Sequence, residues 1–597
     1  MGLNNIWGYD TETVEKNGGG QPYTFQLTCG DIQLFHEQKD LNPVHFRNVF
    51  LGTVGRYCED GDALFSYNLF FENQVLFRDR LFLFSQNRID IKFGDCRIRG
   101  VLEEPTPFLS LTYGEGTRKQ KTIWIIDSAK YFGGDTGQTL EVVAKEFLPM
   151  RKLKRPPYLG KRKPFSYEKK SFKNYAMVDS LLTESLGGII KKYHNEAGLD
   201  KWCFSVAHLA GQFFNKDFCE GRKLDLAHPV IEGGAMWSRF GGYRRGWVPS
   251  GIYENFVHLD LKSAYPWAYS NIRAYFKGAY YDSRKIPNDG EGIYKIDTVL
   301  PRNDIRPLFQ RRGKNNRIET QPLNKRIQFW TTGLEILAYK KIWGKEWDYK
   351  ILKGYEWKGQ NKYKPLKAWA DYAFKIKESA KGDKSDWRYN FGKALANHIT
   401  GKFDSSLKMN KEEWLTPQGL ITIQDIRPGS LRNLFVASII RGKVRARVWA
   451  ESRYNQKFPP EPSIQEMTDS MDIPEKNLKH FKISDKLGGW GIECKGTLIF
   501  HRTGSYLYYD KGKFPKVAFH GIQFRNPKTG KFDPVSFLKF VGKGAGIYYR
   551  VRMVRARESL RVDRGKSALR FRPKKFNLKI PKNFIKEVAQ WLKRKRL

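Results

Sequence analysis

Length sets the first limit on how this chain folds. Its 597 residues exceed what one hydrophobic core can organise, so we expect two to four domains. No run of about 18 apolar residues occurs, which argues against a membrane-spanning helix. The opening residues, MGLNNIWGYDTET, do not resemble a secretion signal, because no basic stretch is followed by an apolar one. We therefore expect a cytoplasmic protein without a membrane partner.

The charge of the chain points to the kind of partner it binds. Lys and Arg number 106 against 62 acidic residues, which gives a formal net charge of +44. So large a surplus destabilises a compact chain by self-repulsion and is typical of proteins that bind nucleic acid. The six cysteines include no CxxC pair, so a disulfide framework and a zinc site are both disfavoured.

Basic residues are concentrated in two segments. The segment 541–597 holds 19 Lys and Arg residues against three acids. The segment 150–170, MRKLKRPPYLGKRKPFSYEKK, is interrupted by prolines and is expected to be a loop. Dense charge is commonly only a solvated surface, but interleaved aromatic residues favour contact with phosphates and bases. The segment 541–597 has four such residues, Tyr548, Tyr549, Phe571 and Phe576.

Two carboxylates stand two residues apart near the N-terminus. In IWGYDTET, a strand-like stretch carries Asp10 and Glu12, and residues i and i+2 of a strand project to the same face. Such a pair can share a metal ion, although two exposed acids at a strand edge would have the same spacing. Further acids follow at Glu72 and Asp179, and Tyr175 precedes Asp179 by one helical turn.

The order of these residues resembles the three motifs of DnaQ-like 3′→5′ exonucleases, which are DxE, Asn-x-x-Phe followed by an acid, and YxxxD. In that family four acids hold two divalent ions and a tyrosine orients the attacking water. Glu72 stands where the family prefers Asp. Thr139 resembles part of a single-strand-binding element of such domains and equally fits the start of a helix. The resemblance implies metal binding by Asp10, Glu12, Glu72 and Asp179, and water orientation by Tyr175.

A second set of acids lies farther along the chain. Asp260 ends the apolar stretch FVHLD and opens DLKSAYP, and a buried carboxylate there is costly without a cation. The alternative is that Asp260 caps the next helix. Lys393 and Asn397 are one helical turn apart in a segment whose expected C-terminal stop is Gly401. Asp469 follows in MTDSM, a short turn between apolar flanks.

These elements, DxxSxYP, KxxxNxxxGKF and TDS, resemble motifs A, B and C of family B DNA polymerases, and they follow the exonuclease motifs as in that family. The resemblance implies that Asp260 and Asp469 hold two Mg²⁺ ions, with Mn²⁺ as an alternative, for phosphoryl transfer to a primer 3′-hydroxyl. Tyr265 would exclude a ribose 2′-hydroxyl and Asn397 would position the nascent base pair. Phosphates of the incoming nucleotide would contact Lys393, with Lys381 and Lys384 as further ligands.

Several positions depart from the family pattern or leave two assignments open. Motif B has His398 and Thr400 where Ser and Tyr are usual, and motif C begins with Met467 where Asp is usual. The family's YxGG linker matches either RFGG at 239–242 or YRRG at 243–246. A later Lys-x-Tyr motif retains its tyrosine but has Gly504 in place of the lysine. DNA contacts are therefore expected at Gly241, Gly242, Tyr243, Arg244, Tyr506, Arg550, Arg552, Arg555 and Arg557.

The resemblance implies an α/β fold with an RNase-H-like exonuclease domain followed by a right-hand polymerase of palm, fingers and thumb. WTTG at 330–333 through KGYEW at 353–357 resembles an insertion of protein-primed members, and residues 406–436 read as a second insertion with a hairpin turn at 417–419. The expected boundaries are 1–199 for the exonuclease, 200–275 for the palm with motif A, 276–365 for the first insertion, 366–405 for the fingers, 406–436 for the second insertion, 437–540 for the palm with motif C and 541–597 for a basic thumb.

Three hypotheses for the function remain open at this point. The first is a protein-primed, strand-displacing replicative DNA polymerase of a phage, virus or linear plasmid. The second is a polymerase of the same branch that initiates without a protein primer or has lost proofreading. The third is a catalytically inactive nucleic-acid-binding scaffold. We expect a monomer whose partners are template and primer DNA, dNTPs and, under the first hypothesis, a terminal protein.

Overall fold

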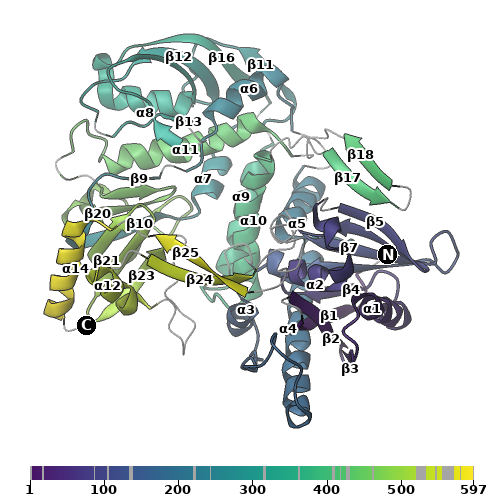
Figure 1. Cartoon of the computed structure of the whole chain (residues 1–597). Helices are drawn as coiled ribbons and strands as arrows, with labels where there is room; N and C mark the ends of the chain where they lie inside the picture. Colours follow the sequence, from purple (N-terminus) through teal and green to yellow (C-terminus); the bar gives the residue numbers. More distant parts are fainter. Residues whose placement is uncertain are drawn as a thin grey trace.

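The computed structural model describes residues 3–595 with internal gaps. The gaps are 17–18, 86–87, 104–105, 133–138, 220–223, 243, 305, 313–317, 361–362, 406–410, 417–418, 425–430, 460, 462, 520–532, 545–546, 554–570 and 578–579. Within the described residues the chain combines helices with mixed and antiparallel sheets, so the expected α/β class is confirmed (Figure 1). None of the helices in this described part is both long and apolar enough to cross a bilayer.

The N-terminal part is built on a mixed sheet of ten described strands. Strand β1 lies inside this sheet, antiparallel to β2 and parallel to β4. The two acids of β1 are therefore not at a sheet edge. In sheet order the strands are β18 (Gly419–Gln424), β17 (Lys411–Thr416), β5 (Arg88–Phe93), β6 (Cys96–Val101), β7 (Phe108–Tyr113), β8 (Lys121–Asp127), β4 (Ala63–Ser66), β1 (Ile6–Lys16), β2 (Gly19–Cys29) and β3 (Ile32–Glu37).

The long helix α4 (Lys169–Glu196) lies directly on β1. Gly8 makes this approach possible, because a Cβ at this position would lie 1.9 Å from the backbone oxygen of Ser180. The Ser180 hydroxyl also donates a hydrogen bond to the Gly8 carbonyl at 2.9 Å. The helix that carries Asp179 is thus fixed against the strand that carries Asp10. The other helices of this part are α1 (Pro43–Tyr57), α2 (Leu69–Leu76) and α3 (Leu140–Phe147).

The hairpin expected around residues 417–419 is present as β17 and β18, while its turn at 417–418 lies outside the described residues. β17 also pairs in parallel with β5, with Trp414 opposite Arg88 and Leu415 opposite Ile89. A hairpin from the second half of the chain therefore extends the edge of the N-terminal sheet (Figure 1).

The second sheet has seven described strands and carries the other acids. β10 lies in its interior and pairs antiparallel with β20 and β21. Helices α7 (Ala264–Ser270) and α11 (Leu434–Ser452) pack beside it. In order the strands are β23 (Lys513–Phe519), β22 (Ser505–Asp510), β21 (Trp490–Arg502), β10 (Gly251–Leu261), β20 (Ser470–Pro474), β19 (Gln465–Met467) and β9 (Arg244–Gly246).

A helix pair, α9 (Pro365–Ser379) and α10 (Trp387–Phe403), stands between the two large sheets (Figure 1). The expected stop at Gly401 is wrong, because α10 continues through Gly401 to Phe403. Phe403 is fully buried, and its burial holds the last turn in helical form although glycine disfavours it. One continuous apolar core joins α4, α10 and β10 through residues such as Leu182, Leu395 and Leu259.

The remaining elements form two smaller units. A four-stranded sheet in the order β11 (Gly278–Asp282), β16 (Tyr349–Gly359), β12 (Gly292–Val299), β15 (Arg326–Thr332) packs with α6 (Pro229–Ser238) and α8 (Gly333–Trp343). Near it lies the two-stranded pair β13 (Gln310–Arg312) and β14 (Ile318–Thr320). Toward the C-terminus, α12 (Pro534–Gly542) and α14 (Lys582–Lys595) pack around Trp591, and β24 (Ile547–Met553) pairs with β25 (Phe571–Asn577). α5 (Val206–Phe213) packs on α10.

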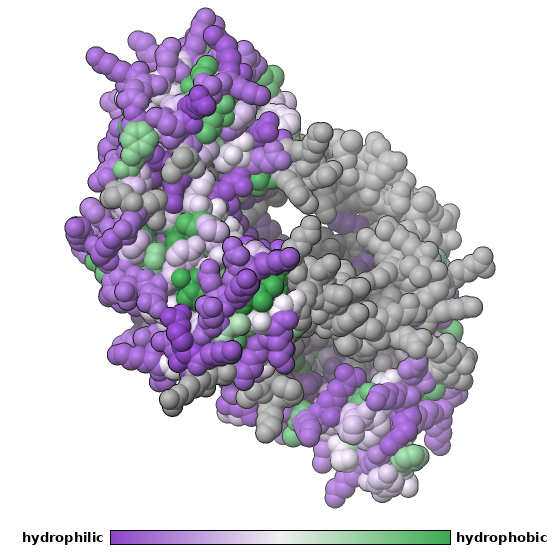
Figure 2. All heavy atoms as spheres, turned by 60° about the vertical axis from the view of Figure 1, so that its left-hand side comes forward, coloured by the Kyte–Doolittle hydropathy of each residue, from purple (hydrophilic) through white to green (hydrophobic). Residues whose placement is uncertain are grey.

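The described surface is mainly hydrophilic on the face shown in Figure 2, where apolar side chains occur in small separate groups. This agrees with a chain that keeps a large net charge in water.

Two candidate carboxylate sites

The first candidate site joins β1 to α4. Asp10, Glu12 and Asp179 each present a carboxylate oxygen, and these atoms lie within 4.8 Å of one another. Asp10 and Glu12 share one face of β1, as the i, i+2 spacing predicts. Tyr175 is buried one helical turn before Asp179. The structure therefore brings two residues of β1 together with two residues of α4 that are distant from them in the sequence.

The carboxylates of this site repel one another. Withdrawal from solvent, followed by the charges of Glu72, Asp179 and Glu12, holds the pKa of Asp10 well above its usual value. Burial and then Asp179 raise the pKa of Glu12 to about 8. Asp10 Oδ2 and Asp179 Oδ1 are buried without a hydrogen-bond partner in the described part of the chain. Unpaired oxygens on clustered carboxylates are what a divalent cation binds, so the site fits a metal ion.

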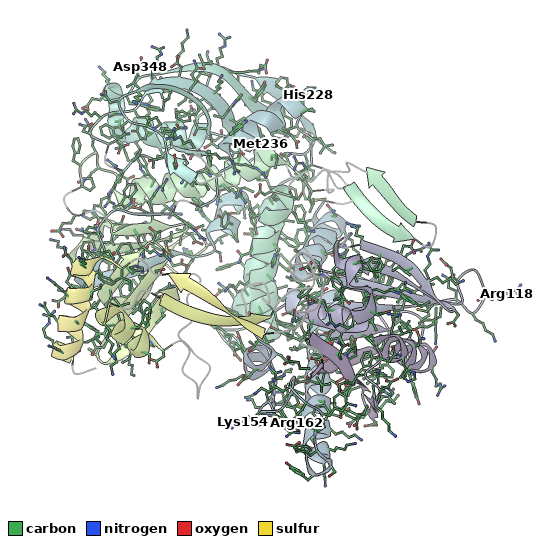
Figure 3. The ribbon with its side chains drawn as sticks, viewed as in Figure 1. Arg118, Lys154, Arg162, His228, Met236 and Asp348 are labelled. Carbon is green, nitrogen blue, oxygen red and sulfur yellow. The ribbon has the colours of Figure 1, made fainter. Side chains whose placement is uncertain are left out.

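Lys152 partly offsets this repulsion, and the sequence analysis did not single it out. Its ammonium forms an ion pair with Asp179 and lies 5.4 Å from the centre of the Tyr175 ring. The same charge opposes the rise in the pKa of Asp10 and Glu12. Its only sequence signal was membership of the basic segment 150–170, which is a loop as expected over 151–165. Lys154 and Arg162 of that segment project beside α4 in Figure 3.

Glu72 lies next to the three-acid cluster but is not one of its members. It sits on α2 and accepts a hydrogen bond from the Thr11 hydroxyl. Its pKa is well above the usual value, because burial outweighs the Thr11 bond and because Glu12, Asp127 and Asp179 repel it. Asn68, which precedes α2, has a left-handed φ of 75°.

Thr139 caps α3 with its hydroxyl, so it begins a helix.

The second candidate site lies at the end of β10. Asp260 is opposite Ser470 of β20, and the Leu261 amide donates a hydrogen bond to the Asp469 carbonyl at 2.8 Å. Asp469 occupies the tight turn between β19 and β20 after Thr468, whose φ is 62°. The capping alternative for Asp260 is wrong, because α7 begins after Ser263.

The charge of a third acid, Glu493, acts on both Asp260 and Asp469. Burial, then the charges of Asp469 and Glu493, raise the pKa of Asp260 to about 7. Burial is also the main cause that raises the pKa of Asp469, to which Glu493 adds, while Arg244 opposes it. Glu493 has no signal in the sequence, because an acid in the strand-like GIECKG looks like an ordinary exposed residue. Two half-buried carboxylates that repel each other suit a divalent cation, while among the described residues only the first site has three carboxylates within 4.8 Å of one another.

The segment 239–242, which precedes β9, contacts the turn that carries Asp469. A Cβ on Gly242 would lie 2.3 Å from the Thr468 side chain, so the RFGG segment reaches this turn as only glycine allows. Gly241 has open space around it. Arg244 follows on β9, and its charge reaches Asp469. Tyr243 lies outside the described residues, so the YRRG alternative is not resolved here.

Lysines gather on the helical side of the second site. Lys393 and Asn397 are exposed on one face of α10. Burial lowers the pKa of Lys377 on α9, and the positive charges of Lys393 and Lys262 lower it further. No sequence motif singles out Lys377 and Lys262, and Lys381 and Lys384 remain predicted ligands of the phosphates. These two lie in the turn between α9 and α10.

The two predicted tyrosines have different surroundings. Tyr265 is on α7, and burial raises its pKa, with Asp469 adding and Arg441 opposing. Tyr506 is 1% exposed and stacks on His258 with ring centres 5.7 Å apart. In the C-terminal segment, Arg550 and Arg552 lie on β24. Nothing is described of their side chains, and Arg555 and Arg557 lie outside the described residues.

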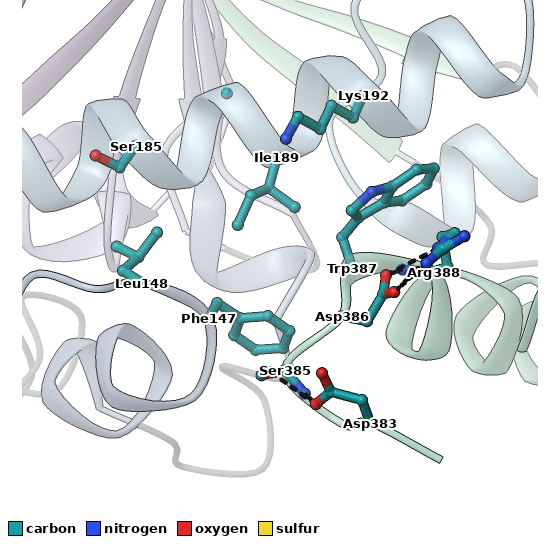
Figure 4. A pocket seen from close by; sticks show the side chains of 11 residues that line it. Phe147, Leu148, Ser185, Ile189, Lys192, Asp383, Ser385, Asp386, Trp387 and Arg388 are labelled. Carbon is teal, nitrogen blue, oxygen red and sulfur yellow. Dashed lines mark hydrogen bonds and ion pairs between the residues drawn. The ribbon is translucent and has the colours of Figure 1, made fainter. Parts of the chain in front are cut away.

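A cavity of about 650 Å³ with a mixed polar and apolar lining lies between α4 and the start of α10 (Figure 4). Phe147, Ile189 and Trp387 face it. Asp386 and Arg388 form an ion pair on one side of it, at the start of α10 (Figure 4). The acids of the two candidate sites do not line this cavity.

Comparison with known proteins supplies the context for both sites. The family model described as DNA polymerase type B, organellar and viral, matches residues 161–429. A search of curated proteins found no match.

Solved structures show the fold. Phi29 DNA polymerase in complex with primer-template DNA and incoming nucleotide substrates has a TM-score of 0.68 and 15% identity, over 96% of this chain and 100% of that one. Phi29 DNA polymerase in complex with single-stranded DNA has a TM-score of 0.66 and 14% identity, over the same shares of the two chains. The expected arrangement of an exonuclease-type domain followed by a right-hand polymerase is thereby confirmed.

Proposed function

We propose, on the premise that this chain belongs to the organellar and viral type B DNA polymerases, that it adds dNTPs to a primer 3′-hydroxyl at Asp260 and Asp469. Template-directed DNA synthesis is the activity of that family, and it uses divalent metal ions. The observation that carries the site assignment is that two half-buried acids, Asp260 at the end of β10 and Asp469 in the turn before β20, repel each other. Mg²⁺ ions, with Mn²⁺ as an alternative, would neutralise the triphosphate and activate the primer hydroxyl when bound there.

The side chains around these acids have separate tasks in this proposal. Lys393, Lys377 and Lys262 form a positive group that suits the phosphates of an incoming nucleotide. Their mutual repulsion is relieved when an anion binds between them. Tyr265, beside Asp469, is placed to exclude a 2′-hydroxyl, and Asn397 to position the nascent base pair.

We further propose a proofreading 3′→5′ exonuclease at Asp10, Glu12 and Asp179. Metal ions bound there would activate water for attack on the terminal phosphodiester. Lys152 holds the Asp179 carboxylate and offers positive charge to the departing phosphate, and Tyr175 orients the water. Glu72 lies beside the three carboxylates and accepts a hydrogen bond from Thr11, the residue between Asp10 and Glu12, so it would help to fix β1 in this site.

The larger organisation is proposed on the same basis. Residues 1–199 would be the exonuclease, 200–275 and 437–540 the palm, 366–405 the fingers and 541–597 a thumb that tracks duplex DNA. The insertions at 276–365 and 406–436 would support protein priming by a terminal protein and strand displacement. The pairing of β17, within 406–436, with β5 of the N-terminal sheet supports contact between the second proposed insertion and the proposed exonuclease.

A primer-extension assay tests the proposal. With a labelled template-primer, dNTPs and Mg²⁺, Asp260→Asn and Asp469→Asn should each abolish extension and retain DNA binding. Asp10→Ala combined with Glu12→Ala should retain extension and lose degradation of single-stranded DNA. Each pair of variants is the control for the other.

The outcomes separate synthesis with proofreading, synthesis without proofreading and DNA binding without synthesis. Extension by either Asn variant would refute the assignment of Asp260 and Asp469. A wild type that binds DNA without extending it would identify a scaffold. A wild type that extends without degrading, and gains degradation on Glu72→Asp, would identify lost proofreading.

A further inference from the structure

The basic segment 150–170 leaves two aromatic rings exposed at the start of α4. Tyr167 is 78% exposed and Phe165 is 52% exposed. The two rings stack, with their centres 5.7 Å apart and an angle of 26° between their planes. Single exposed aromatic residues are common on protein surfaces, whereas a stacked pair in water offers a flat apolar surface to a ligand.

An arginine extends this stack toward the interior of the N-terminal part. The Arg162 guanidinium lies 3.8 Å from the centre of the Phe165 ring and 4.6 Å from the centre of the Tyr158 ring. Glu168 accepts hydrogen bonds from Arg162 Nη1 at 2.7 Å and from Nη2 at 2.9 Å. It also accepts one from the Phe165 amide at 2.7 Å, so one carboxylate fixes two members of the stack. We call Tyr158, Arg162, Phe165 and Tyr167 the aromatic platform.

The backbone of the aromatic platform is held by further contacts. The Lys163 ammonium donates a hydrogen bond to the Lys39 carbonyl at 2.5 Å, which ties the platform to the segment before α1. Pro164 is buried, and its ring fixes the backbone next to Phe165. A surface that is fixed in this way loses little conformational freedom when a ligand binds to it.

The aromatic platform is continuous with the first carboxylate site. Tyr158 packs against the apolar cluster that contains Tyr175. Lys152, at the start of the same loop, pairs with Asp179. Lys169 opens α4 directly after the platform, and the ten residues from there to Asp179 span about 15 Å at the helical rise. A stacked single strand covers that distance with about four nucleotides.

The charge around the aromatic platform indicates the kind of ligand. The segment 150–170 has nine Lys and Arg residues and one acid. Lys161 and Lys170, which flank the platform in the sequence, are exposed. Flat ring surface beside positive charge suits single-stranded nucleic acid, which binds by base stacking and phosphate contacts. Duplex DNA covers the faces of its own bases, so it presents no base that could stack on Tyr167.

We propose that the aromatic platform binds a base of single-stranded DNA about four nucleotides from the 3′ end that occupies the first carboxylate site. The base stacks on Tyr167, and Lys161 and Lys170 contact the phosphates of the strand. The platform raises the affinity for longer single strands and leaves the hydrolytic step unchanged. The inference rests on the proposed function, because it takes the first carboxylate site as the place of the 3′ end.

The length of the substrate tests the aromatic platform. A trinucleotide is too short to reach it from the first carboxylate site, whereas a strand of 12 nucleotides passes over it. Loss of one stacked base weakens binding by roughly 5-fold to 100-fold. Tyr167→Ala should therefore raise KM for degradation of the longer strand by that factor, with kcat unchanged. For the trinucleotide, kcat/KM should equal that of the parent.

Three further variants serve as controls in the same assay. Tyr167→Trp keeps a flat ring and should behave like the parent. Tyr167→Leu keeps an apolar side chain without a ring and should behave like Tyr167→Ala. Tyr57→Ala removes a ring that is 42% exposed at the end of α1. This helix covers the other face of the sheet from α4, because Tyr9 of β1 contacts α1 and Gly8 contacts α4, so KM should not change.

Photo-crosslinking locates the strand without relying on activity. The full chain with Asp10→Ala and Glu12→Ala is mixed with single strands that carry one 5-iododeoxyuridine at successive positions. Crosslinks to Tyr167 or Phe165, identified by peptide mass spectrometry, should be strongest when this base stands about four nucleotides from the 3′ end. The same strands in duplex form should give none at these two residues.

The outcomes keep the platform and the proposed function apart. An unchanged KM of Tyr167→Ala for the longer strand would overturn the proposal, and so would the absence of crosslinks to Tyr167 and Phe165. Equal increases in KM for the trinucleotide and the longer strand would also overturn it, because the effect would then lie at the 3′ end. A wild type that degrades no DNA, together with crosslinks to Tyr167, would refute the exonuclease and support the platform as a single-strand site.

Discussion

Adding a single methyl group at Gly8 should slow the proposed exonuclease activity without altering any carboxylate. A Cβ at Gly8 would lie 1.9 Å from the Ser180 carbonyl oxygen and 2.7 Å from Thr28 Oγ1, whereas real contacts stay beyond 3.0 Å. Helix α4 must therefore retreat from β1 by about 1 Å. Asp179 is the neighbour of Ser180, so it retreats from Asp10 and Glu12 with the helix.

The size of the effect follows from this displacement. Misplacing a catalytic group by about 1 Å costs roughly 100-fold in rate, so Gly8→Ala should degrade single-stranded DNA about 100-fold more slowly. Forcing an extra methyl into a close-packed contact should also lower the free energy of unfolding by about 1–3 kcal/mol. Primer extension, which depends on the second carboxylate site, should be close to wild type.

Gly188→Ala on the same helix is the matched control. A Cβ at Gly188 meets no atom within 4 Å, so the substitution adds the same methyl without a clash. It should leave degradation unchanged and stabilise the helix by about 0.5–1 kcal/mol. The assays are degradation of labelled single-stranded DNA and thermal unfolding of both variants. Wild-type degradation and an unchanged unfolding temperature in Gly8→Ala would refute the argument that this contact sets the geometry of the first site.

Other predictions concern the second site and the basic segment. Tyr265→Val should admit ribonucleotides, and an unchanged preference for dNTP over rNTP in single-nucleotide kinetics would remove the role of Tyr265. Asp260 has a pKa of about 7 in the folded chain, above its unfolded value, so its contribution to stability is lost as pH rises from about 4 to about 7. Asp260→Asn should therefore stabilise the metal-free protein more at pH 8 than at pH 5, and equal shifts in thermal unfolding at the two pH values in EDTA would contradict the repulsion. Replacing four arginines of segment 541–597 should flatten the salt dependence of DNA affinity, since each phosphate contact adds about −0.9 to the slope of log K against log salt. The four residues are Arg550, Arg552, Arg555 and Arg557. An unchanged slope in a fluorescence titration would exclude them from DNA binding.

The sequence by itself determined which residues share a face, where those residues are close together in one strand or one helix. Asp10 and Glu12 are two residues apart on one strand, and Lys393 and Asn397 are one turn apart on one helix, so the periods of strand and helix already place each pair on a common face. The order of the acidic motifs indicated the α/β arrangement and the two centres. These inferences succeed because they depend on the chain within one element.

Only the tertiary structure decided what those residues meet. Lys152 pairs with Asp179 from a loop, and the charge of Glu493, the extra residue of a bulge in β21, acts on Asp260. Neither partner has a spacing that a pattern can read, because the contact is made between elements that are distant in sequence. The same reason explains why α10 runs past Gly401: the burial of Phe403 in a core shared by several elements outweighs the local preference of glycine to end a helix. The period of a strand or helix determines which face of the element carries a side chain, and packing between distant elements determines which residues that side chain contacts.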